Sequence, residues 1–182
     1  MKKELSVGVY TLVTDGVDGL PRIRETGSYE KHDVIPERAL AAPEKIAEAL
    51  NELFGTEAKA EEAVYMVVFG QAFRPVGIFS AGSGDLGTVP GNTQGLLIRA
   101  LLCGGKYAAV IHNHPSGYTL PSRADRKTLE KMSEAFRIVG IELSDFIIVG
   151  KNNLYSEAIS GDGSIIKKLV PESEAGLLYG YR

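Results

Sequence analysis

Short apolar runs separated by longer amphipathic segments constrain the fold of this chain most strongly. The run Ala63–Phe69 (A-V-Y-M-V-V-F) is rich in β-branched and aromatic residues, a pattern typical of a strand covered on both faces. Ser144–Gly150 (S-D-F-I-I-V-G) has the same character, and Tyr107–Ile111 (Y-A-A-V-I) also reads as a strand. Further strands are expected at V-G-I-F-S, as a hairpin partner of the first run, and around Leu154–Ser156.

The segments between these runs have helical periodicity. In P-E-K-I-A-E-A-L-N-E-L-F-G, apolar residues recur at Ile46, Leu50 and Phe54, Pro43 suits the first turn, and Gly55 suits the end. Two more helices are expected, over 93–103 and from about 123 to 139. Because strands alternate with helices, the sequence predicts an α/β (α+β) fold with a mixed central sheet flanked by helices.

The chain divides into three parts by composition. Residues 1–40 are predicted to be an N-terminal extension with a strand and a loop, since S-V-G-V-Y-T-L-V alternates and T-D-G-V-D-G-L-P supplies turns. Residues 41–160 form the main domain, and the tail 161–182 is polar and then poor in core-forming residues. The glycine-dense loop 81–92 lacks the spacing of a nucleotide-binding signature. The oligomeric state is open, with the apolar Leu177–Tyr179 available to dock on a neighbour.

Composition excludes several classes of protein. Hydrophobic residues make up 44% of the 182 residues, and 20 Lys and Arg against 23 Asp and Glu give a net charge of -3. That balance does not support broad binding to nucleic acid. No run is apolar enough for a membrane span or signal peptide, so a cytoplasmic protein is expected. The single cysteine, Cys103, excludes an intramolecular disulfide and a cysteine-based zinc site, and is expected to pack in the core.

The stretch after the middle strand carries the chemistry: H-N-H-P-S-G-Y-T-L-P-S-R-A-D. His112 and His114 lie two apart at the end of a strand, so their side chains point to the same side while Asn113 points away. Asp125 can be a third ligand if the prolines and glycine between them turn the chain back. Two nitrogens and one carboxylate leave the fourth tetrahedral position open for water, the pattern of a catalytic zinc site. The remaining histidine, His32 in E-K-H-D, is typical of a solvated side chain.

The spacing Ser122-x-x-Asp125 has a second interpretation. It is also the signature of a helix N-terminal cap, in which the serine oxygen accepts from the backbone N–H three residues on. The two interpretations are compatible, because a serine fixed at a helix N-terminus can also donate to a developing oxyanion.

Taken together, His-x-His, seven residues and Ser-x-x-Asp resemble the JAMM motif of MPN+ metalloproteases, in particular their RadC-like JAB branch. The resemblance runs from about Pro43 to Ser156 and takes in G-I-E-L-S-D-F-I-I-V. It implies a JAB/MPN fold with the three-layer, cytidine-deaminase-like architecture. It also implies a zinc metallopeptidase of JAMM type, which acts on a peptide or protein substrate.

The resemblance carries over residue by residue. It implies that His112, His114 and Asp125 hold one Zn²⁺ per chain and that Ser122 is the motif serine. The general base of the family stands just ahead of the first central strand, which places it on Glu62, with the adjacent Glu61 left open.

The chain departs from the family pattern in two places: the first removes any role of a histidine in the late strand, and the second, at the N-terminus, weakens a role in DNA repair. This chain has Asp145-Phe146 where the family commonly has Asp-His, and residues 1–40 do not resemble the helical hairpin domain of longer members. A nuclease is disfavoured, because the letters H-N-H of that class are scattered residues and the charge is acidic. The remaining alternative is a non-enzymatic JAB module that binds a partner or DNA, in DNA repair or in a mobile element.

Overall fold

A single mixed sheet organises the molecule. The computed structural model describes residues 3–14, 18–84 and 93–166, and its strands lie in the order β2-β1-β4-β3-β5-β6-β7. Their bounds are β1 (Leu5–Thr14), β2 (Pro21–Lys31), β3 (Ala63–Phe69), β4 (Pro75–Ser83), β5 (Tyr107–Asn113), β6 (Glu142–Val149) and β7 (Leu154–Ser156). The pairs β1–β4 and β5–β6 are parallel and the others antiparallel, so the predicted mixed sheet is confirmed.

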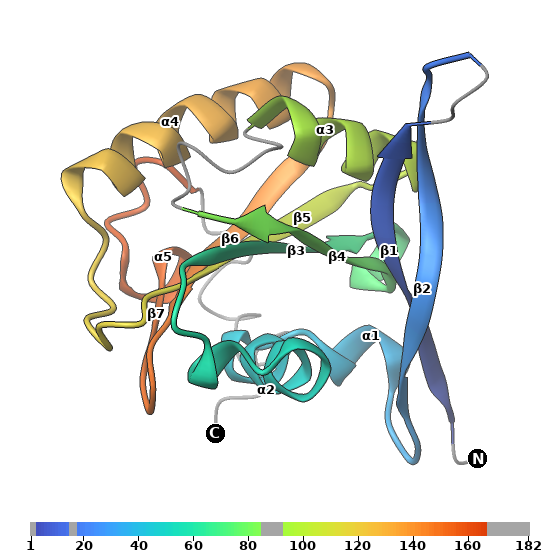
Figure 1. Ribbon diagram of the computed structural model, residues 1–182, viewed down its shortest axis with the longest axis horizontal. Helices are drawn as coiled ribbons and strands as arrows, with labels where there is room; N and C mark the ends of the chain where they lie inside the picture. Colours follow the sequence, from blue (N-terminus) through green and yellow to red (C-terminus); the bar gives the residue numbers. More distant parts are fainter. Residues whose placement is uncertain (1–2, 15–17, 85–92, 167–182) are drawn as a thin grey trace.

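Helices cover both faces of this sheet. They are α1 (Pro36–Ala39), α2 (Pro43–Phe54), α3 (Thr93–Leu102), α4 (Arg123–Ile138) and the short α5 (Glu157–Ser160). Figure 1 shows α3 and α4 on one face and α1 and α2 on the other, which gives three layers. No helix in the described residues is long and apolar enough to span a bilayer.

The central strand β3 explains why its sequence is apolar without alternation. Val64, Met66 and Val68 pack in the core under α3 and α4, whereas Tyr65 and Val67 pack in the core over α2. Every residue of β3 is buried. Because both faces are covered, each position needs an apolar side chain, and the prediction of a strand covered on both faces is confirmed.

The first forty residues contain the expected strand, as β1, and a second strand, β2, where only a loop was expected. β1 and β2 form an antiparallel hairpin, and β1 pairs in parallel with β4, so both strands extend the main sheet. Leu5, Val7 and Tyr29 are buried in the core shared with α2. β2 is an edge strand whose side chains are mostly exposed and polar, a composition that blocks edge-to-edge pairing and also hides the strand from a search for apolar periodicity.

Two predicted features lie partly outside the described residues. Residues 85–92 of the glycine-dense loop are not described, nor are residues 167–182 with Leu177–Tyr179.

Cys103 is half-buried against the core under α3, and its thiol donates to the backbone oxygen of Arg99 (3.1 Å). Burial raises the pKa of the Cys103 thiol to about 11, which disfavours a reactive thiolate.

Candidate metal site

The register between β3 and β5 brings an acid to the two histidines. The antiparallel ladder of these strands ends with the pair Val64–His112. In an antiparallel pair, two residues back on one strand correspond to two forward on the other, so Glu62 falls opposite His114. On its other side the Glu62 carbonyl accepts from the backbone N–H of Gly84 (2.7 Å). Sheet pairing therefore places Glu62 and the His-x-His segment at the same edge.

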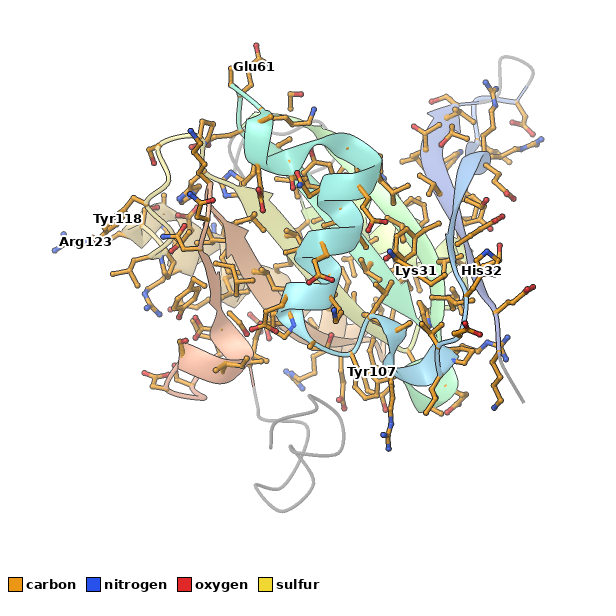
Figure 2. The ribbon with its side chains drawn as sticks, turned by 90° about the horizontal axis from the view of Figure 1, so that it is seen from below. Lys31, His32, Glu61, Tyr107, Tyr118 and Arg123 are labelled. Carbon is orange, nitrogen blue, oxygen red and sulfur yellow. The ribbon has the colours of Figure 1, made fainter. Side chains whose placement is uncertain are left out.

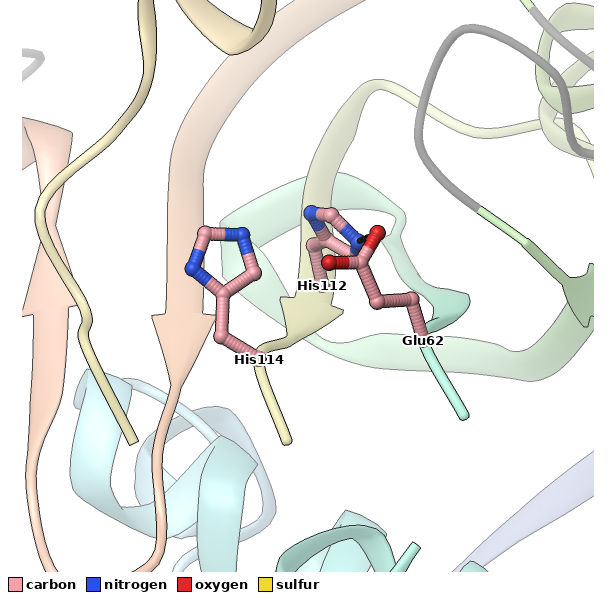
Figure 3. Close-up of side chains that lie close together, drawn as sticks. All are labelled: Glu62, His112 and His114. Carbon is pink, nitrogen blue, oxygen red and sulfur yellow. Dashed lines mark ion pairs between the residues drawn. The ribbon is translucent and has the colours of Figure 1, made fainter. Parts of the chain in front are cut away.

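His112 is the most deeply buried member of the group. Its side chain is 1% exposed, and its Nε2 lies 3.3 Å from Glu62 Oε2 (Figure 3). Neither ring nitrogen has a hydrogen-bond partner in the described part of the chain, since the Glu62 contact lacks hydrogen-bond geometry. Burial, and then the neighbouring His114, lowers the pKa of His112 and favours the neutral ring. A buried polar ring without partners is costly, so the position is suited to a ligand that binds nitrogen.

His114 is oriented by a backbone contact. Its Nδ1 lies 2.7 Å from the carbonyl oxygen of Tyr118. Because a carbonyl oxygen only accepts, Nδ1 carries the proton and the lone pair is on Nε2. The two imidazoles lie edge to face, with ring centroids 4.7 Å apart (Figure 3). A hydrogen bond from one nitrogen to a carbonyl, with the other nitrogen free, is the usual arrangement of a histidine that binds a metal.

Asp125 returns to both rings from the first turn of α4. Its Oδ1 lies 3.9 Å from Nδ1 of His112, and its Oδ2 lies 3.9 Å from Nε2 of His114. The same residue completes a capping box: Ser122 Oγ accepts from Asp125 N (3.1 Å), and Asp125 Oδ2 accepts from Ser122 N (2.8 Å). The cap is thus present, and it holds the carboxylate beside the histidines rather than competing with that role.

The loop between β5 and α4 makes this return possible. The N–H of His114 donates to Val149 O of β6 (2.8 Å), and Gly117 N donates to His114 O (2.9 Å). Gly117 has a positive φ of 77°, which a residue with a side chain rarely adopts. A side chain at Gly150 would stand 3.0 Å from the Gly117 carbonyl. The turn is therefore packed against the end of β6.

Three of these side chains could hold a metal ion. Glu62, His112 and His114 each offer one atom, and the three atoms lie within 4.8 Å of one another. Asp125 adds a fourth donor on the Nδ1 side of His112. Asp125 is not part of that three-atom group: its Oδ1 lies 3.9 Å from His112 Nδ1, whereas Glu62 Oε2 is beside the other nitrogen, Nε2, and its Oδ2 lies 3.9 Å from His114 Nε2. The residues present therefore suit a metal with nitrogen and oxygen ligands.

All five predicted site residues line one open cleft of about 310 Å³. Its walls are formed by Glu62, His112, His114, Ser122, Ala124, Asp125 and Thr128. The alternative base, Glu61, is exposed and points away from the body of the molecule (Figure 2). The volume is at the lower end of the range of small-molecule sites.

Some residues of the site were not predicted. Thr128 follows Asp125 by three residues on α4, so helical spacing could have identified it. Tyr118 contributes only its backbone carbonyl, which no side-chain pattern reveals. Asn113 does point away from the histidines as expected, but its carboxamide binds the backbone on both sides of Glu62.

Comparison with known proteins places the chain in a family. The fold is that of a JAB-type domain, and the family model "RadC-like JAB domain" matches residues 40–161. The chain therefore belongs to the RadC-like JAB domain family.

Curated relatives of the chain are bacterial proteins named UPF0758. A UPF0758 protein of Actinobacillus pleuropneumoniae serotype 5b (strain L20) is 32% identical over 130 residues, which cover 65% of this chain and 58% of that protein. UPF0758 protein YfjY of Escherichia coli (strain K12) is 33% identical over 79 residues, 43% of this chain and 49% of that protein. One from Histophilus somni (strain 2336) is 40% identical over 62 residues, 34% and 28% of the two chains. The chain thus matches between 28% and 58% of the length of these three relatives.

Proposed function

We propose that the protein is a zinc-dependent metallohydrolase that cleaves a peptide or isopeptide amide bond. The observation that carries the proposal is the buried His112, whose ring nitrogens lack hydrogen-bond partners in the described residues while His114, Asp125 and Glu62 surround it. Membership of the JAB domain family supports the choice of an amide substrate.

The ligands in this proposal are His112, His114 and Asp125. Two imidazoles and a carboxylate suit zinc better than Mg²⁺ or Ca²⁺, which prefer sites made of oxygen. When bound in such a site, zinc polarises a carbonyl group and lowers the pKa of bound water to about 7. His114 is held for this task by Tyr118, and Asp125 by the capping box.

Glu62 is the general base in this proposal. Its carboxylate lies beside His112 Nε2 and is half-exposed, so it reaches both the metal ligands and the open cleft. Glu62 takes a proton from the attacking water at a carboxylate oxygen and passes it to the leaving amine nitrogen. General acid–base catalysis of this kind contributes a factor of roughly 10² to 10⁴ in rate.

Ser122 supplies a hydrogen-bond donor to the developing oxyanion. Its oxygen accepts from Asp125 N, so the hydroxyl proton is left to point into the cleft. Loss of one such donor costs on the order of 3 kcal/mol of transition-state stabilisation.

Metal analysis tests the first step of the proposal. Protein purified without chelators should carry close to one zinc per chain, and His114→Ala should lose it because one of the three ligands is gone. His32→Ala is the matched control, since His32 is exposed and remote from the site. A wild-type protein that neither contains a divalent metal nor binds added zinc in a calorimetric titration would refute the proposal.

The role of Glu62 is tested separately. Glu62→Gln should keep the metal and lose about 10²-fold to 10⁴-fold of its turnover on a panel of quenched peptides and isopeptides. Glu61→Gln, one residue away, should retain turnover because its side chain points to solvent. If the Glu62→Gln variant binds zinc and turns over normally, the base is another group. A wild-type protein that binds zinc but cleaves no member of the panel favours the partner-binding alternative.

A further inference from the structure

We infer that Asn113 is a positioning residue that holds Glu62 in place for proton transfer, an inference that rests on the proposed function. Asn113 is 2% exposed and lies on the opposite face of β5 from the two histidines. Its Oδ1 accepts from the backbone N–H of Ala63 (2.7 Å), and its Nδ2 donates to the backbone carbonyl of Glu61 (3.1 Å). The one carboxamide therefore grips the chain immediately before and immediately after Glu62.

This grip is needed because Glu62 lies beyond the end of the sheet. β3 begins at Ala63, and the last pair in its ladder with β5 joins Val64 to His112. Beyond that pair, the Asn113 side chain makes the hydrogen bonds to the β3 backbone that a paired strand would otherwise make. It can do so because a carboxamide has the same donor and acceptor as a peptide group. Gly84 N holds the Glu62 carbonyl from the β4 side (2.7 Å). The backbone around Glu62 is therefore hydrogen-bonded on both sides, by Asn113 and by Gly84.

The placement links the base to the metal ligands through one strand. Successive side chains of a strand point to opposite faces, so His112 and His114 reach the metal site while Asn113 between them reaches the backbone around Glu62. Any shift of β5 therefore moves the ligands and the base together. A carboxylate that must accept and return a proton depends on being held to within fractions of an ångström.

Substitutions of Asn113 can remove its two hydrogen bonds, to Ala63 N and to Glu61 O, separately or together. Asn113→Asp would keep an acceptor for Ala63 N but would place an oxygen against the Glu61 carbonyl, where the native residue donates. Asn113→Ala would leave both buried backbone groups without their partner. These two substitutions therefore remove one or both contacts while the histidines and Asp125 remain.

The test compares Asn113→Ala with Ser144→Ala. Ser144 is the matched control because it is buried and its hydroxyl donates to the Ala108 carbonyl of the same strand β5, at the end remote from the site (3.1 Å). In Asn113→Ala, hydrogen exchange at the Ala63 amide should accelerate by about tenfold or more, because its acceptor is lost. Ser144→Ala should leave exchange at Ala63 unchanged.

Metal binding and turnover then separate positioning from structural support. Asn113→Ala should bind zinc within about threefold of the wild-type Kd and lose on the order of a hundredfold in kcat with little change in KM. Combined with Glu62→Gln it should lower kcat no further than Glu62→Gln alone, because both changes remove the same function. Asn113→Asp, of the same size, should show the same loss of kcat with less effect on Ala63 exchange, and it serves if the alanine variant does not fold.

Three results would overturn the inference. They are an unchanged kcat in Asn113→Ala, a loss of kcat that adds to that of Glu62→Gln, and a loss of zinc affinity in parallel with activity, which would mean that Asn113 only supports the histidines. A wild-type protein without zinc or turnover contradicts the hydrolase instead. Hydrogen exchange at Ala63 still reports the grip in that case, so the two failures are distinguishable.

Discussion

In the proposed mechanism, Ser122 uses different parts of one hydroxyl group for two purposes. Its oxygen accepts from Asp125 N and so caps α4, and in the proposal its hydroxyl proton donates into the cleft that Ser122 lines. Asp125 in turn accepts from Ser122 N and faces both histidines. At the scale of the residue, the atoms that cap α4 are therefore also the candidate site atoms. The two roles differ in what a substitution would change: the cap affects stability, and the site affects turnover.

Replacement of Ser122 by Ala and by Gly separates the two consequences. Ser122→Ala should lower the free energy of unfolding by about 1 kcal/mol and Ser122→Gly by a few tenths, because glycine is tolerated as a cap. Both should lose roughly 10²-fold to 10³-fold in kcat, since both lack the hydroxyl donor. Urea unfolding and turnover measured on the same samples check this. If turnover follows stability, with the glycine variant nearly as active as wild type, Ser122 is only a cap.

At the scale of elements, Asp145 joins β6 to β7 and α5. Its Oδ2 accepts from Ser156 Oγ (2.7 Å), and its Oδ1 accepts from Phe146 N (2.7 Å) and Ala158 N (3.0 Å). Burial raises the pKa of this carboxyl group to about 7, although these hydrogen bonds act in the opposite direction. Phe146, the next residue, is fully buried and packs in the core under α4.

The raised pKa of Asp145 predicts a fall in stability with rising pH. The folded state binds the proton more tightly than the unfolded chain, whose pKa is near 3.8, so this stabilisation is complete below about pH 4 and is lost as pH rises through about 7. The loss amounts to about 4 kcal/mol over the whole pH range. Asp145→Asn cannot ionise, and its amide can still accept from Phe146 N and Ala158 N.

Urea unfolding from about pH 5 to about pH 8 measures this effect. The free energy of unfolding should decline less with pH in Asp145→Asn than in wild type. Asp162→Asn is the control, because the pKa of the exposed Asp162 is lowered and the residue does not titrate in this range. Parallel pH profiles for wild type and Asp145→Asn would show that the buried carboxyl group stays ionised throughout.

At the scale of the whole molecule, the hairpin β1–β2 extends the sheet beyond the part that the family model matches. That part begins at residue 40, whereas Leu5, Val7, Val9 and Tyr29 of the hairpin belong to the core over α2. Strand β4 would otherwise be the exposed edge of the sheet. The hairpin therefore covers an edge and completes one of the two cores, and it does so on the side of the sheet away from the β5–α4 loop.

This arrangement predicts that the hairpin affects stability and not metal binding. Leu5→Ala should lower the free energy of unfolding by about 2–5 kcal/mol, because the side chain is 3% exposed and leaves a cavity. Leu20→Ala, at a position that is 57% exposed near the hairpin turn, should change it by less than about 0.5 kcal/mol. Zinc titration should give the same Kd for both variants. Equal stabilities would mean that the hairpin is not part of the cooperative unit.

The sequence by itself predicted the features that depend on neighbouring residues. Burial of both faces of β3 was readable because each position must then be apolar, and the limits of α2 and α4 were readable because Pro43, Gly55 and the Ser122–Asp125 box act within one turn. The spacing of the histidines predicted that both would share one side of β5, since the period of a strand is two residues.

Only the tertiary structure decided which groups meet across the chain. The polar edge strand β2 gave no apolar signal, because an edge strand has little to bury. The contact of Asn113 with Ala63 joins residues 50 apart in the sequence, and the choice of Glu62 over Glu61 depends on the register of β3 against β5. Register is set by packing of both sheet faces and not by local conformation, so a shift of one residue would have turned the other glutamate toward His112.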